Sequence, residues 1–248
     1  MNSSSEATAP VSEVSDRIII ALDVSSKDEA LSLARDLKDR VGAFKVGLQL
    51  FAAAGPEFVR ELVREGHRVF LDLKFHDIPN TVAHAAVEAA RLGVWMMNVH
   101  TLGGREMMER TVVAVREACA AEDLERPLII GVTILTSATT ETLGSIGISD
   151  SVETEVERLA RLAAESGLDG VVASPLEVAT VRAAVQTPDF IAVTPGIRPG
   201  NATRDDQRRV TTIREAFAMG SDFVVIGRPV LQAKDRAAAL EQMIRECE

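Results

Sequence analysis

The chain has 248 residues, of which 46% are hydrophobic and 26% charged, as is typical of a globular protein with one large domain or two small ones. A net charge of −10 argues against a general nucleic-acid-binding protein, because that function needs a broad basic surface. The sequence contains no apolar run long enough for a transmembrane helix. Its two cysteines, without a CxxC motif, favour a reducing cytoplasm.

The first segment of the chain, residues 1–15, is polar and slightly acidic. It lacks the basic start and the apolar centre of a signal peptide. Because this segment offers little apolar surface to bury, we expect a disordered leader there, followed by a single domain over residues 16–248.

Short β-branched runs alternate with longer amphipathic stretches eight times along the chain. One such stretch, residues 151–167, repeats apolar residues at a 3-4 spacing, which predicts a helix with one apolar face. Eight strand-then-helix units predict an α/β fold, the (β/α)8 TIM barrel. The alternative, a doubly wound open sheet, usually has fewer units and often a GxGxxG turn, which the sequence lacks. The predicted strands are residues 17–24, 43–47, 68–75, 95–101, 128–135, 170–175, 190–196 and 223–229.

Residues 70–82, FLDLKFHDIPNTV, place two carboxylates and an ammonium group in and after a strand-like apolar stretch. Strand alternation puts Phe70, Asp72 and Lys74 on one face, so the two charged side chains should point into the barrel near the carboxyl ends of its strands. Asp77 follows in the loop. A structural ion pair is the alternative, but burying ions is costly and two carboxylates around one lysine are not a neutral pair. A catalytic role is therefore favoured.

Two earlier strands add charges at equivalent places, with Asp23 at the end of the first and Lys45 on the second. Either residue taken alone could face solvent. Together with Asp72, Lys74 and Asp77, however, they form a cluster in which ammonium groups alternate with carboxylates. Such a cluster can keep two ammonium groups charged at neutral pH while it directs a carboxylate at a substrate.

The loops after the last two predicted strands carry arginines that suit an anion. Arg198 lies in TPGIRPG, and Gly227 and Arg228 lie in IGRPV. In TIM barrels these loops commonly bind phosphate through backbone N–H groups and a cation, and arginine matches phosphate geometry. Gln207, in DDQRRV, could donate its amide to the same ligand. The alternative for Arg228 is a solvated surface arginine.

Residues 72–81, DLKFHDIPNT, fit the signature D-x-K-x-x-D-I-x-x-T of the orotidine 5′-phosphate decarboxylases. The chain resembles the shorter bacterial members of this family from about Arg17 to the last helix. The other matching segments, in chain order, are ALDV with Asp23, FKVG with Lys45, VTILTS with Thr136, TPGIRP with Arg198, DDQRRV with Gln207, and IGRP with Gly227 and Arg228.

The resemblance implies decarboxylation of orotidine 5′-phosphate to uridine 5′-phosphate and CO₂, the last step of de novo UMP biosynthesis, without a metal or an organic cofactor. It implies that Lys74 protonates C6 as CO₂ leaves, and that Asp72 lies against the departing carboxylate, whose charge is lost in the transition state. Lys45 would hold both residues in place and contact the ribose. Asp23 would accept a hydrogen bond from a ribose hydroxyl.

The resemblance also implies an obligate homodimer, in which Asp77 and Thr81 reach into the partner's active site. It places Thr136 against the pyrimidine ring, with the role of Ser137 left open. The 5′-phosphate would be bound by Arg198, Gln207, Gly227 and Arg228. Neither nucleic acid nor a membrane is expected as a partner.

Two other functions compete with this interpretation. Related barrels that act on sugar phosphates such as 3-keto-gulonate 6-phosphate need Mg²⁺ and an extra carboxylate at the end of strand two, where this chain has Lys45, a cation that would repel the metal. A non-catalytic nucleotide-binding barrel could dispense with Lys74. His76 differs from Lys74 in strand parity, which favours a loop or packing role, whereas His100 is equally suited to lining the site and to packing.

Overall fold

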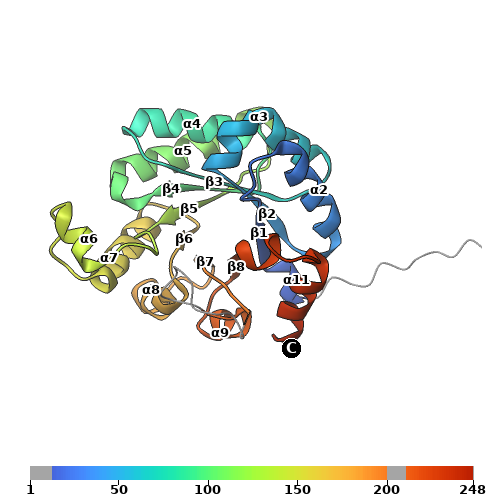
Figure 1. The fold of residues 1–248 in the computed structure, drawn as a ribbon. Helices are drawn as coiled ribbons and strands as arrows, with labels where there is room; N and C mark the ends of the chain where they lie inside the picture. Colours follow the sequence, from blue (N-terminus) through green and yellow to red (C-terminus); the bar gives the residue numbers. More distant parts are fainter. Residues whose placement is uncertain (1–12, 200–210, 248) are drawn as a thin grey trace, which may run out of the picture.

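The computed structural model describes residues 13–199 and 211–247. Within them, parallel strands form a closed barrel in which neighbours pair in chain order and β8 pairs with β1 (Figure 1). The strands are β1 Ile18–Ala21, β2 Ala43–Gly47, β3 Val69–Phe75, β4 Met96–His100, β5 Leu128–Val132, β6 Gly170–Val172, β7 Ile191–Thr194 and β8 Phe223–Ile226. The predicted TIM barrel is confirmed, and each strand starts within one residue of its predicted start.

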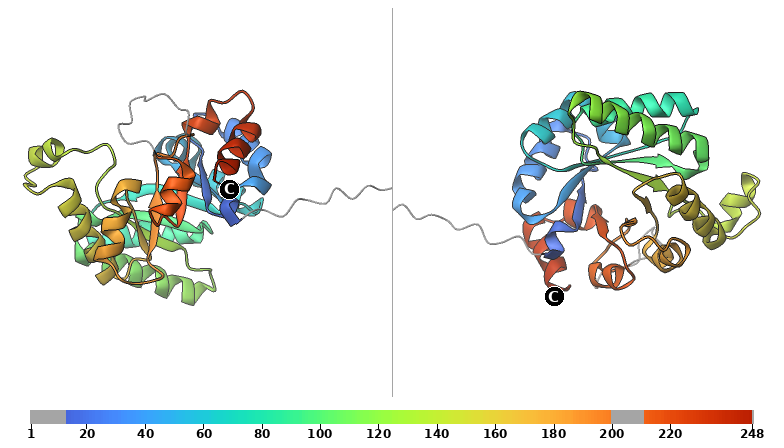
Figure 2. Two further views of the ribbon diagram at one scale, coloured as in Figure 1. Left: turned by 90° about the horizontal axis from the view of Figure 1, so that it is seen from below. Right: turned by 180° about the vertical axis from the view of Figure 1, so that it is seen from behind.

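Helices surround the barrel on its outer side (Figures 1 and 2). The α-helices are α1 Glu13–Asp16, α2 Lys27–Leu37, α3 Leu48–Arg64, α4 Pro79–Arg91, α5 Arg105–Glu122, α6 Thr140–Ser145, α7 Val152–Glu165, α8 Val178–Ala184, α9 Ile213–Ala218, α10 Arg228–Leu231 and α11 Arg236–Arg245. The described residues also form the 3-10 helices η1 Lys38–Arg40, η2 Thr101–Gly103 and η3 Pro175–Glu177. No helix of the described residues is long and apolar enough to cross a membrane.

The N-terminal cap of α7 and its apolar face show why the predicted segment forms a helix. Ser151 precedes the helix and accepts a hydrogen bond from the backbone N–H of Thr154 at 3.1 Å, which satisfies one of the unpaired donors of the first turn. Val156 and Leu159 are buried and pack in the core. The segment therefore combines a capping residue with one apolar stripe.

The boundary of the N-terminal leader differs from the prediction by a short helix. The leader was expected over residues 1–15, but residues 13–15 belong to α1 and Ser15 is buried. Arg17, which follows α1, donates hydrogen bonds to the carbonyl oxygens of Ser221 at 2.6 Å and Asp222 at 2.9 Å. These bonds join the start of β1 to the segment before β8.

Apolar side chains fill the barrel in a small inner layer, separate from the larger core between the strands and the helices. At the amino-terminal end of the strands, Trp95 and Phe223 pack edge to face with their ring centroids 5.2 Å apart. The buried residues of this inner layer are Ile19, Ala21, Ala43, Phe70, Met96, Ile130, Val193 and Val225. Two residues further along the first four strands, the inward positions are polar, and these positions form the candidate site.

Gly170 provides a test of the close packing between β6 and β7. A Cβ at this position would lie 2.2 Å from the carbonyl oxygen of Ile191 on β7. Because a backbone atom cannot yield as a side chain can, Gly170→Ala is expected to lower the free energy of unfolding by about 1–3 kcal/mol in urea denaturation. Gly144→Ala, on α6, is the matched control, since Gly144 is exposed and no described atom outside its chain neighbours and the adjoining helix backbone lies within 4 Å of the new Cβ. It should leave stability unchanged or raise it by up to about 1 kcal/mol. Equal stabilities of the two variants would contradict the packing argument.

Candidate active site

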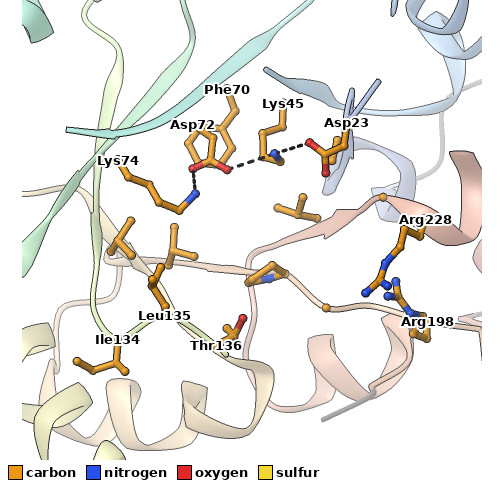
Figure 3. A pocket seen from close by; sticks show the side chains of 17 residues that line it. Asp23, Lys45, Phe70, Asp72, Lys74, Ile134, Leu135, Thr136, Arg198 and Arg228 are labelled. Atoms are coloured by element: carbon orange, nitrogen blue, oxygen red, sulfur yellow. Dashed lines mark hydrogen bonds and ion pairs between the residues drawn. The ribbon is translucent and has the colours of Figure 1, made fainter. Parts of the chain in front are cut away.

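A cavity of about 270 Å³ opens at the carboxyl ends of the strands. It contains most of the site residues predicted from the sequence (Figure 3). Its walls are formed by Ala21, Asp23, Lys45, Phe70, Asp72, Lys74, Val132, Ile134, Leu135, Thr136, Val172, Pro195, Gly196, Arg198, Val225, Gly227 and Arg228. The cavity thus has an ionic side formed by the first three strands, an arginine side formed by the last two, and apolar residues between them.

Four charged side chains form an alternating chain along the ionic side (Figure 3). The Lys45 ammonium lies 3.1 Å from Asp23 Oδ1 and 3.2 Å from Asp72 Oδ2, so it bridges the two carboxylates. The Lys74 ammonium lies 2.5 Å from Asp72 Oδ1. Asp72 therefore has an ammonium group on each of its two carboxylate oxygens.

Burial and the neighbouring charges act in opposite directions on the two central residues, whose side chains are only 11% (Lys45) and 12% (Asp72) exposed. Burial alone would lower the pKa of Lys45, but the negative charges of Asp72 and Asp23 outweigh it and hold this pKa above the ordinary value. Burial alone would raise the pKa of Asp72, but Lys45 and Lys74 hold it below the ordinary value. Both central residues are therefore ionised at neutral pH.

The backbone at Lys74 departs from the regular strand that the sequence predicted. Lys74 has φ +52°, and the pairing of β3 with β4 shifts register between Leu71 and Phe75. The predicted alternation is therefore wrong at this point, because an irregularity of the strand interrupts it. Lys74 nevertheless lines the cavity together with Phe70 and Asp72.

Asn98, on β4, is a site residue that the sequence analysis missed. Its side chain is fully buried and donates a hydrogen bond to Asp72 Oδ1 at 2.7 Å. It also accepts one from the backbone N–H of Lys74 at 2.8 Å. The available signal was a polar residue in an apolar strand, two positions after the inward-facing Met96.

Two arginines form the opposite side of the cavity, where Figure 3 shows their guanidinium groups close to one another. Arg228 begins α10 directly after Gly227. Arg198 follows Ile197, which forms a bridge with Thr211, and its backbone N–H donates to the carbonyl of Thr211 at 3.1 Å. Gln207, predicted to join this group, lies outside the described residues.

Asp77 and Thr81 are described residues, but neither lines the cavity of its own chain. Both are exposed, and Asp77 Oδ1 accepts a hydrogen bond from the backbone N–H of Ile78 at 2.6 Å. The charged cluster predicted from one chain therefore contains Asp23, Lys45, Asp72 and Lys74 but lacks Asp77. Thr136 lines the cavity, whereas the exposed Ser137 is not among the described residues that line it.

The two histidines near the site contact each other rather than the cavity. The rings of His76 and His100 lie 5.5 Å apart between centroids. Burial, together with the nearby His76 and Lys74, lowers the pKa of His100, which is therefore neutral at pH 7. His76 is exposed in the loop after β3, and neither ring lines the cavity of the described residues. The structure therefore places neither histidine in the cavity, and only His100 is partly buried.

A TIM barrel with an ionic cluster on its first strands and arginines after its last two has the arrangement of barrel enzymes that bind phosphorylated substrates. No group of three or more His, Cys, Asp or Glu side chains in the described part of the chain could hold a metal ion.

Comparison with known proteins identifies the family. Residues 16–243 match the model of the orotidine 5′-phosphate decarboxylase / HUMPS family, and the chain belongs to this family. It is 53% identical over 234 residues to the orotidine 5′-phosphate decarboxylase of Syntrophotalea carbinolica, covering 94% of this chain and 96% of that protein. The orotidine 5′-phosphate decarboxylase of Geobacter sulfurreducens is 53% identical over 231 residues, with 93% and 95% covered. The crystal structure of the Lactobacillus acidophilus orotidine 5′-phosphate decarboxylase superposes with a TM-score of 0.80 at 34% identity, covering 93% of this chain and 98% of that one.

The ionic chain leads to a prediction about stability. Lys45→Met should lower the free energy of unfolding at pH 7 by about 3–5 kcal/mol, because it leaves the buried Asp72 without one of its two cations. Lys27→Met is the matched control. Lys27 forms a 2.7 Å pair with Glu61, but its side chain is 45% exposed, so its loss should cost less than about 1 kcal/mol.

Lys45→Met should also change how the free energy of unfolding depends on pH in the acid range. In the wild type the pKa of Asp72 is depressed, so its contribution is complete above the unfolded pKa and is lost only as the pH falls through the folded pKa. Without the positive charge of Lys45, the effect of burial is less well compensated, and the pKa of Asp72 rises. The loss of stability should therefore begin at a higher pH in Lys45→Met, and an unchanged pH dependence in the acid range would count against the argument.

Proposed function

We propose that this protein converts orotidine 5′-phosphate to uridine 5′-phosphate and CO₂, the last step of de novo UMP biosynthesis, in the cytoplasm. The observation that carries the proposal is the pair of ammonium groups on Asp72 in a cavity that also contains two arginines. Membership of the family and about 50% identity to proteins with this name support it.

In the proposed reaction, Lys74 is the general acid. The bond between C6 and the carboxylate breaks, CO₂ departs, and the electron pair remains on C6. The Lys74 ammonium transfers a proton to C6 and later regains one from water. An ammonium group is suited to this step because its charge stabilises the developing carbanion before the proton moves.

Asp72 contributes to the proposed reaction through repulsion. Its carboxylate is held ionised by Lys45 and Lys74, so a substrate carboxylate placed beside it meets a like charge. This repulsion disappears as the substrate carboxylate becomes neutral CO₂. A contact that is unfavourable only in the ground state accelerates the reaction, provided that the rest of the substrate supplies the binding energy.

The rest of the cavity is suited to supply that binding energy. We assign the 5′-phosphate to Arg198 and Arg228, together with Gly227 and Gln207, because guanidinium groups bind phosphate through paired hydrogen bonds. Asp23, whose side chain is 55% exposed, remains available to a ribose hydroxyl although it pairs with Lys45. Thr136 is assigned to the pyrimidine ring, since it lies on the wall opposite the ionic chain (Figure 3).

Lys45 also supports a reaction without a metal ion. Its ammonium group occupies the position between Asp23 and Asp72 that a bridging cation would need. A divalent ion placed there would meet this positive charge. The Mg²⁺-dependent sugar-phosphate reaction is therefore disfavoured for this chain.

A homodimer with shared sites completes the proposal. Asp77 and Thr81 lie outside the cavity of their own chain, which suits side chains that act in a partner's site. The segments directly after β2, β3 and β4 expose Leu48 (60%), Ile78 (66%) and Leu102 (38%), and burying such residues against a second copy is favourable. This arrangement would give each site two carboxylates and two ammonium groups from one chain and Asp77 from the other.

Purified protein treated with a chelator should consume orotidine 5′-phosphate, measured as the loss of orotate absorbance. Lys74→Ala should lower kcat by at least about 10²-fold to 10⁴-fold, because it removes the general acid, without a comparable loss of uridine 5′-phosphate binding. Lys27→Ala, an exposed lysine, is the control and should retain wild-type activity. Absence of turnover by the folded wild-type protein would refute the proposed reaction and direct attention to Mg²⁺-dependent sugar phosphates.

Mixing two inactive variants tests the shared site separately. If Asp77 acts in the partner's site, Lys74→Ala and Asp77→Ala protomers that exchange freely should form heterodimers with one intact site. An equimolar mixture should then recover about a quarter of the wild-type activity. If Asp77 acts within its own chain, the mixture should stay inactive, although gel filtration would show that exchange had taken place.

A further inference from the structure

The backbone irregularity in β3 is centred on the proposed general acid. Leu71 on β3 pairs with Met97 on β4, and the next paired residues are Phe75 and Val99. Between these two pairs, β3 therefore contains more residues than β4. The additional residues on β3 leave backbone groups without their regular partners on the neighbouring strand. Lys74 lies in this stretch with φ +52°, a conformation that costs a residue other than glycine about 1–2 kcal/mol.

Asn98 lies opposite this irregularity and uses both ends of its amide there. Its Oδ1 accepts the backbone N–H of Lys74 at 2.8 Å, which supplies the partner that the strand ladder does not. Its Nδ2 donates to Asp72 Oδ1 at 2.7 Å. The side chain is 0% exposed, so water cannot replace either bond without opening the barrel.

We propose that Asn98 is a positioning residue, which fixes the Lys74 backbone and the Asp72 carboxylate relative to each other. The catalytic consequence rests on the proposed function, whereas the positioning itself does not. Asp72 Oδ1 receives both the Asn98 amide and the Lys74 ammonium, the latter at 2.5 Å. The Asn98 amide therefore connects the Lys74 backbone to the Asp72 carboxylate, which the Lys74 ammonium group also contacts.

The chemistry at this position requires a neutral side chain that both donates and accepts. A carboxylate would still accept the Lys74 N–H but would place a second negative charge against Asp72. An aliphatic side chain would leave the buried N–H without a partner and would remove one donor from Asp72. The amide meets both requirements, and the two bonds together determine which end of it faces each neighbour.

The consequence for the reaction is geometric. Without the amide, the Asp72 carboxylate is held only by its two ammonium groups, one of which is the mobile Lys74 side chain, and the Lys74 backbone can relax out of the left-handed conformation. The ammonium group would then move relative to C6, and displacements of about 1 Å commonly cost about 10²-fold in rate. Substrate affinity, which depends mainly on the distant arginines, would change much less.

Asn98→Ala and Asn98→Asp test this proposal. Asn98→Ala should lower kcat about 10²-fold while leaving the affinity for uridine 5′-phosphate near its wild-type value. It should also raise the pKa of Asp72, observed by carbon NMR of the carboxyl group, and accelerate hydrogen exchange at the Lys74 amide. Thr111→Val is the matched control. Thr111 is equally buried and its hydroxyl donates to the Met107 carbonyl at 2.7 Å on α5, so the variant should lose stability while kcat and the Asp72 titration stay unchanged.

Asn98→Asp keeps the acceptor for the Lys74 N–H and provides a second test should Asn98→Ala fail to fold. Its carboxyl group, raised in pKa by Asp72, can donate to Asp72 only when protonated. The ratio of its kcat to that of the wild type should therefore increase as the pH falls, which a purely structural role would not produce.

The proposal would be overturned if kcat in these variants fell only in proportion to the folded fraction, or if the Asp72 titration and the Lys74 amide exchange matched the wild type. Both NMR measurements are independent of turnover. A wild-type protein that failed to decarboxylate orotidine 5′-phosphate would therefore refute the proposed reaction while leaving the positioning role open to confirmation by the same spectra.

Discussion

The site depends on the ammonium group of Lys45, which is buried between two carboxylates. Removing an ion from water costs several kcal/mol, and an isolated buried pair often gains nothing in return. Here the charges alternate from Asp23 through Lys45 and Asp72 to Lys74, so each buried charge has opposite charges as neighbours. The cluster depends most on its buried central pair, because removing Lys45 leaves Asp72 with only one of its two cations and Asp23 without its ammonium partner.

The barrel brings these charges together because its strands are parallel and because their amino-terminal halves pair regularly. The apolar layer of Ala21, Ala43, Phe70 and Met96 is followed, two residues along each strand, by a polar residue. All carboxyl ends meet at one end of the barrel, so the last two strands add their arginines to the same cavity. A chain with a net charge of −10 thus has a local positive excess where an anionic substrate would bind.

The fold and most of the site could be predicted because they follow from short-range patterns. Alternation along the strands was enough to place Asp23, Lys45 and Asp72 in one cavity. It did not reveal the role of Asn98, which depends on the pairing of β3 with β4, a contact between residues distant in sequence. The cluster inferred from charge spacing also included Asp77, and this part of it was wrong for a different reason. The chain turns into α4 directly after it, so proximity to Lys74 in the sequence did not become proximity in the cavity.

The conformation of Lys74 bears on what the site is built to do. A glycine would adopt φ +52° without strain, and a regular strand would avoid the irregularity altogether. A glycine, however, would carry no ammonium group, and it is the Lys74 ammonium that lies 2.5 Å from Asp72, while Asn98 satisfies the Lys74 backbone N–H. The chain instead has a strained lysine, Lys74, whose backbone is held by the fully buried Asn98. Strain concentrated at one residue of a site, and compensated by a neighbour from another strand, indicates that the position of that side chain matters more than local stability.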